Sequence, residues 1–202
     1  MGPSQKSLMN LRLRSLLSAI LLAVLIFLPS AAFAGMTPKE VGAFNSNKYL
    51  AERGDRAGQY NLGVCYFNGF GVAVDQMEAV SWWRKSAEQG DAQAQYNLGN
   101  CYGAGHGILK DYVKAHFWCQ KAIDQGLDAA LSWMGLCYHN GDGVKKDIIE
   151  AYAYWKIAGA SHEGARDYLA DLEKKMSWDD RYLGQLRAKK LKEEIEARRV
   201  GK

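Results

Sequence analysis

The chain has 202 residues and a formal net charge of +4, from 26 Lys and Arg against 22 Asp and Glu. Three of the basic residues and none of the acidic ones lie in residues 1–34, so the remaining 168 residues carry 23 against 22, a net charge of +1. This balance gives no support to nucleic acid as a partner, and the length suits one domain with a continuous core.

Residues 1–34 have the layout of a secretory signal peptide. Three basic residues make the N-terminus positive, residues 16–28 form an apolar run, and Ala32 and Ala34 are the small residues expected just before a cleavage site. We expect cleavage before Gly35 and export, with the bacterial periplasm as the destination and the cell exterior as the alternative. An uncleaved anchor is disfavoured because a spanning helix needs about 20 apolar residues.

The rest of the chain is dominated by an internal repeat of 36 residues. The segment Leu-Gly-Val-Cys-Tyr at 62–66 returns as Leu-Gly-Asn-Cys-Tyr at 98–102 and as Met-Gly-Leu-Cys-Tyr at 134–138. A period of this length is typical of stacked helical repeats, which usually hold partners rather than carry out chemistry. The full copies are expected at residues 54–89, 90–125 and 126–161.

Each copy is predicted to fold as helix, glycine loop and helix. In the second copy, Ala94, Leu98 and Tyr102 follow one another at intervals of four residues, on one helical face. Gly105 and Gly107 then break the helix, because glycine adopts the backbone angles of a tight reversal. Asp111 is placed to cap the second helix through its side-chain oxygen.

This pattern resembles the Sel1-like repeat, a relative of the tetratricopeptide repeat. The match is carried best by residues 92–99 (AQAQYNLG) and 69–72 (GFGV), and the resemblance covers residues 54–172. It implies an all-α protein, a right-handed α/α solenoid of helix-loop-helix repeats. It also implies a protein–protein interaction scaffold or adaptor that binds partners in a concave groove lined by the first helices, and it implies no cofactor.

The flanking segments are expected to cap the solenoid. Residues 35–53 contain one capping helix, residues 162–172 begin a fourth repeat without its glycine loop, and residues 173–202 form a charged C-terminal capping helix or tail. Terminal repeats depart from the pattern because they must face water. The tail offers ion pairs four residues apart, such as Lys189–Glu193.

Candidate partner-binding residues lie on the first helices, beside the packed positions of the repeat. Aromatic rings supply buried area and amides pair with a peptide backbone, so together they suit a protein or peptide partner. Phe67, Asn100, Trp133 and His139 are the most informative, because the repeat pattern itself does not require them. The candidate groove residues are Tyr60, Val64, Phe67, Asn68, Tyr96, Asn100, Trp133, Leu136 and His139.

Four cysteines would be exported to an oxidising compartment, where a disulfide is permitted. Cys65, Cys101 and Cys137 share one repeat position, and equivalent positions of stacked helices lie about 10 Å apart, beyond the reach of a disulfide. Cys119 is therefore the bridging partner of any disulfide, with Cys101 or with Cys137, and at most one bridge is expected.

Other chemistry finds little support in the sequence. The four histidines occupy unlike repeat positions and match no zinc spacing, and no signature of a serine nucleophile is present. No metal, cofactor or catalytic residue is therefore predicted. The alternative function, a cell-wall or β-lactam-related hydrolase or binding protein, is implied only by the resemblance to secreted cysteine-rich Sel1 proteins. After signal cleavage no stable membrane anchor is expected, and the partner is a protein or peptide of the cell envelope.

Overall fold

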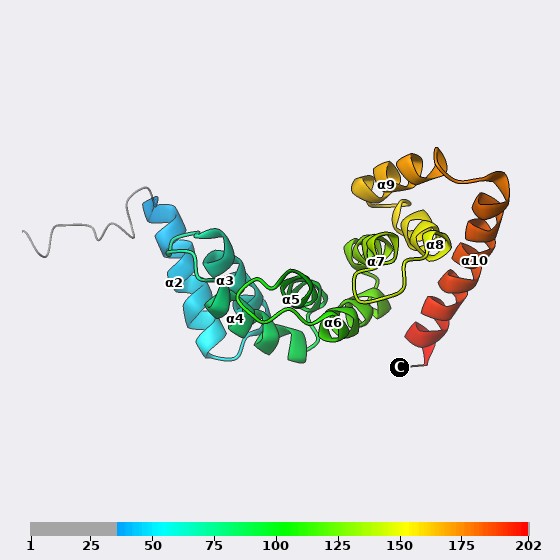
Figure 1. The fold of residues 1–202 in the computed structure, drawn as a ribbon. Helices are drawn as coiled ribbons and strands as arrows, with labels where there is room; N and C mark the ends of the chain where they lie inside the picture. The colour runs from blue at the N-terminus through cyan, green and yellow to red at the C-terminus, as the bar shows by residue number, and fades with distance from the viewer. Residues whose placement is uncertain (1–35, 202) are drawn as a thin grey trace, which may run out of the picture.

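The computed structural model describes residues 36–201, and in that range it consists of helices and turns without strands (Figure 1). The helices are α2 (Pro38–Glu52), α3 (Arg56–Asn68), α4 (Gln76–Glu88), α5 (Ala92–Ala104), α6 (Tyr112–Asp124), α7 (Asp128–Asn140), α8 (Ile148–Ala158), α9 (Glu163–Glu173) and α10 (Trp178–Val200). The predicted all-α repeat solenoid is confirmed. The predicted signal peptide lies outside the described residues, and within them no helix is long and apolar enough to cross a bilayer.

The three repeats are the helical hairpins α3–α4, α5–α6 and α7–α8. The hairpins follow a curve in which α3, α5 and α7 lie on the inner side and α4, α6 and α8 on the outer side (Figure 1). Each second helix begins after an aspartate: Asp75, Asp111 and Asp147 accept hydrogen bonds from backbone amides in the first turn. The predicted cap at Asp111 is thus present, and each such cap stabilises a helix by about 1 kcal/mol.

The loop between the two helices fixes each repeat against the one before it. The second loop glycine has a positive φ and its backbone lies against the start of the preceding outer helix, where a Cβ would overlap an existing atom. Gly71 meets Glu40 in α2, Gly107 meets Gln76 in α4 and Gly143 meets Tyr112 in α6. Because Glu40, Gln76 and Tyr112 are also 36 residues apart, α2 stands where the second helix of an earlier repeat would stand.

Within each hairpin a glycine of the first helix faces one residue of the second helix. Gly63 faces Trp83 and Gly135 faces Trp155, and in both hairpins the indole N–H donates to a backbone carbonyl, of Tyr60 at 3.2 Å and of Ser132 at 3.0 Å. The middle hairpin instead places Cys119 against its glycine. The second repeat therefore has a small residue where the other two have a large ring.

Buried glutamines join successive repeats. The Gln59 amide donates to the Ala51 carbonyl at 3.4 Å, and the Gln95 amide donates to the Ala87 carbonyl at 3.1 Å. The third repeat has Leu131 at this position and cannot repeat the bond.

In the third repeat the carbonyl equivalent to those of Ala51 and Ala87 belongs to Ile123, and it accepts a hydrogen bond from the last helix instead of from a glutamine. Arg199 of α10 donates to it at 2.8 Å. The C-terminal helix thus supplies the side-chain hydrogen bond that a glutamine makes in the first two repeats, beside the backbone bond that the Ile123 carbonyl accepts from Gly126 at 2.9 Å.

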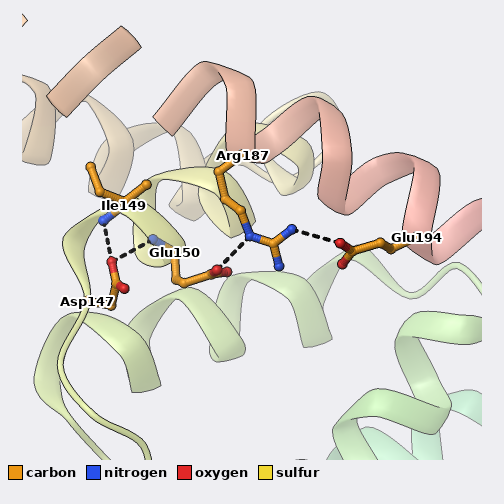
Figure 2. Close-up of polar contacts among 5 residues, drawn as sticks. All are labelled: Asp147, Ile149, Glu150, Arg187 and Glu194. Atoms are coloured by element: carbon orange, nitrogen blue, oxygen red, sulfur yellow. Dashed lines mark hydrogen bonds and ion pairs between the residues drawn. The ribbon is translucent and has the colours of Figure 1, made fainter. Parts of the chain in front are cut away.

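Helix α10 packs along α8 and reaches α6. Figure 2 shows Arg187 between Glu150 of α8, at 2.5 Å, and Glu194 of α10, at 3.1 Å. The expected pair Lys189–Glu193 is not among the ion pairs of residues 36–201; Lys192 instead approaches Glu196 at 4.0 Å. The charged C-terminal segment is therefore held to the body of the protein by arginines, which bind carboxylates with directional bonds.

Candidate functional site

Two neighbouring hollows lie along the first helices. The smaller, of about 320 Å³, lies between α3 and α5, and the larger, of about 450 Å³, lies between α5 and α7. Both are lined by Phe67, Asn100 and His106, so they form one continuous surface. We call this surface, which spans α3, α5 and α7, the groove.

The larger hollow exists because two residues of the second repeat are small. In the first repeat Phe67 packs on Trp83 with ring centroids 5.2 Å apart, and in the third repeat His139 packs on Trp155 at 5.5 Å. The equivalent pair in the second repeat is a glycine and a cysteine, Gly103 and Cys119.

Trp133 from the third repeat occupies part of the space left there. Its ring lies directly over Gly103, 2.8 Å from where a Cβ would be. It is also held edge-on by His116, with centroids 5.5 Å apart. Burial lowers the pKa of His116 and so favours the neutral imidazole beside the tryptophan. Trp133 is thus fixed as one wall of the groove.

Polar groups line the floor and one rim of the groove. The side chain of Asn100, at the junction of the two hollows, makes no hydrogen bond within residues 36–201. Its amide is therefore available to a ligand as both donor and acceptor. At the rim, the Tyr112 hydroxyl donates to Asp142 at 2.9 Å, and the Lys110 ammonium lies over the Tyr112 ring, 4.7 Å from its centroid.

The structure brings together seven of the nine residues predicted from the sequence. The residues that line the groove are Tyr60, Val64, Phe67, Asn68, Asn100, Trp133 and Leu136. Tyr96 lines neither hollow, because it packs against the core of the C-terminal half. His139 also lines neither, because its ring lies against Trp155. Binding by any of these residues stays a prediction.

Sequence reasoning missed the contribution of the loops and of the outer helices. His106, Lys110 and Asp142 come from loops, and Tyr112 begins α6. Gly103 was also missed, although comparing its position with Phe67 and His139 in the other copies would have shown a missing side chain. The groove is therefore lined by residues of the first helices, of the loops and of the outer helices, not by the first helices alone.

The four cysteines are buried free thiols in the structure. Burial raises the pKa of Cys101 and of Cys137 to about 12, and it raises the pKa of Cys119 as well. Cys101 lines the groove together with His106, but a raised pKa is the opposite of what a nucleophilic thiolate requires. The disulfide predicted between Cys119 and Cys101 or Cys137 stays a prediction.

Thiol labelling tests this description of the cysteines. At pH 8 a thiol with a pKa of about 12 is ionised in only about one molecule in ten thousand. We therefore expect no thiol of the native protein to react within minutes with a thiolate-specific reagent, and all four to react in denaturant. Rapid reaction of the native protein would contradict the buried placement, whereas two unreactive thiols in denaturant would establish a bridge.

Metal binding has no support in the described part of the chain, where no cluster of three or more His, Cys, Asp or Glu side chains could hold an ion.

The curved array of helical hairpins with a groove on its first helices defines a helical repeat protein. The Sel1 repeat model matches residues 56–91, 92–127 and 128–161, more than half of the chain, so the chain belongs to the Sel1 repeat family. Sel1 repeat proteins are generally protein–protein interaction scaffolds.

Two solved structures are similar to the chain. A Sel1 repeat protein from Oxalobacter formigenes is 36% identical with a TM-score of 0.62, over 65% of this chain and 54% of that protein. A protective antigen of uropathogenic Escherichia coli with an SLR fold is 28% identical with a TM-score of 0.49, over 78% of this chain and 42% of that protein. The chain thus matches about half the length of these proteins. No curated protein matches it.

Proposed function

We propose that the chain is an exported scaffold protein whose groove binds an extended segment of a partner protein in the bacterial periplasm. The observation that carries this proposal is the open Asn100 amide at the junction of two hollows, with Phe67 and Trp133 on either side. An extended peptide presents backbone groups to such an amide and places apolar side chains in the neighbouring hollows. The groove therefore offers one polar and two apolar contacts to a single segment.

Family and sequence support the proposal from two other directions. Scaffolding is the general role of Sel1 repeat proteins, and the signal-peptide pattern of residues 1–34 supports export. Large rings in partly buried positions contribute most of the energy in protein interfaces. Phe67 and Trp133, both partly buried, are the aromatic residues expected to dominate binding.

A capture experiment with paired variants tests the proposal. The variant with Phe67→Ala and Trp133→Ala is expected to lose at least about 100-fold in affinity for its partner, since each aromatic anchor contributes roughly 2 kcal/mol or more. The tagged chain is recovered from the periplasmic fraction, its first residue is determined, and the proteins it retains are identified by mass spectrometry. We expect Gly35 at the N-terminus.

The control removes the same residue types from an outer helix. Phe117 and Trp118 on α6 pack edge-on, with centroids 5.2 Å apart, and line neither hollow. The variant with Phe117→Ala and Trp118→Ala should retain the partner. If both variants retain it equally, while both keep the helicity of the wild type, the groove is not the binding site. Recovery of the chain only in the cytoplasm would overturn the proposed location.

A further inference from the structure

Helix α10 is apolar on two opposite sides. Gly184, Ala188, Leu191 and Ile195 are buried on the side that packs along α8. At about 100° per residue, a second set of large apolar side chains falls on the side of α10 that faces away from α8. We call this set the outer stripe; its members are Trp178, Tyr182, Leu183 and Leu186, which are 71%, 50%, 51% and 51% exposed.

The side chains of the outer stripe are exposed within residues 36–201. The rings of Trp178 and Tyr182 stack in parallel, with centroids 5.7 Å apart and planes 2° apart. Figure 1 shows α8 along one side of α10 and draws no other helix of residues 36–201 on the opposite side. Isolated exposed apolar residues are ordinary, but a contiguous group on one helix face marks an interaction surface.

Charges beside the stripe identify the partner. Asp179 lies near the start of α10, and Lys189 and Lys190 lie about three turns later, all three exposed. None of the three forms an ion pair within residues 36–201. The helix therefore carries a negative charge at the start of its stripe, and further along it two lysines together with the exposed Glu193. An antiparallel copy can set Asp179 opposite a lysine and is complementary to it in that respect.

We propose that two copies of the chain associate through the outer stripes of α10, paired antiparallel. A register with Tyr182 opposite Leu186 of the second copy brings Asp179 opposite Lys189. The same register brings Trp178 opposite Lys190, an arrangement that suits a cation–π contact. Parallel pairing would instead set Asp179 against Asp179 and lysine against lysine, which is repulsive. The proposal does not depend on the groove, which lies on other helices.

Sedimentation of the purified native chain tests the proposal. The wild type is expected to form dimers that dissociate on dilution, and the variant with Leu183→Glu and Leu186→Glu is expected to be monomeric. The control variant, Leu109→Glu with Val113→Glu, changes residues that are 90% and 80% exposed outside the stripe. It should dimerise as the wild type does.

A charge reversal tests the antiparallel register. Asp179→Lys should raise the dimer dissociation constant at least about tenfold, because like charges then face each other twice in the dimer. Adding Lys189→Asp should restore dimerisation. If the wild type were still monomeric at a protein concentration of about 100 μM, its dimer dissociation constant would lie above that concentration, and this would overturn the proposal. So would a charge reversal without effect or without rescue, or a monomer that binds anionic lipid vesicles through the stripe.

Discussion

Replacing Gly107 with alanine is expected to lower the free energy of unfolding by about 2–5 kcal/mol. The residue has a φ of +66°, which a side chain makes unfavourable by about 1–2 kcal/mol. The added methyl group would also overlap the backbone carbonyl of Gln76, the first residue of α4. Overpacking of this kind costs about 1–3 kcal/mol more, because a helix backbone cannot shift as a flexible side chain does.

Gly90→Ala separates these two effects. Gly90 has a φ of +89°, but nothing lies within 4 Å of the position that its Cβ would take. It should therefore show the cost of the backbone angle alone, about 1–2 kcal/mol. Urea unfolding of the two variants measures the difference. Equal losses would mean that the loop does not hold the second repeat against the first.

The contact at Gly107 explains why the repeats behave as one array. Each loop glycine joins its repeat to the outer helix of the repeat before it, and each buried glutamine adds a second connection. Stability in such arrays is the sum of the repeats and of the interfaces between neighbours. A change at one interface should therefore weaken both repeats that share it.

The fold could be predicted from the sequence because its signals are local and recur three times. The 36-residue spacing, the aspartate caps and the glycine loops each follow from a few neighbouring residues. The position of α10 could not be predicted in the same way. Its attachment includes a bond from Arg199 to a carbonyl on α6, at a place where Leu131 stands instead of the glutamine of the first two repeats.

The candidate groove was predicted in part for a similar reason. The helical face that carries Phe67, Asn100 and Trp133 follows from the period, since these residues lie beside the packed positions. The depth of the groove does not, because it depends on two small residues, Gly103 and Cys119, that lie on different helices. Only their juxtaposition in space shows that a ring is missing there.

Trp155→Ala is expected to have a comparably large effect, a loss of about 3–5 kcal/mol in the free energy of unfolding. Trp155 is 2% exposed and packs on Gly135. Its ring also stacks on Tyr168 of α9, with centroids 5.1 Å apart, so it joins the third repeat to the helix that follows. Removing it would leave a cavity and weaken the attachment of α9, which Ala165 and Leu172 still hold to the core.

Two further variants separate the contribution of the Trp155 ring to stability from that of its hydrogen bond, and compare this position with the equivalent one in the second repeat. Trp155→Phe keeps most of the ring but leaves the Ser132 carbonyl, now 3.0 Å from the indole nitrogen, without its donor. Its expected cost is about 1–3 kcal/mol. Cys119→Ala removes the residue at the equivalent position of the second repeat and should cost about 1 kcal/mol, since only a thiol is lost.

Thermal and urea unfolding of the three variants give the order of these losses. Hydrogen exchange should show in addition that α9 loses protection in Trp155→Ala and keeps it in Cys119→Ala. If α9 kept its protection in Trp155→Ala, the tryptophan would not connect the third hairpin to the cap. If Cys119→Ala destabilised the protein as much as Trp155→Ala, the second repeat, which lacks this ring, would owe its rigidity to the thiol rather than to Trp133, and the groove wall that Trp133 forms would be less firmly held.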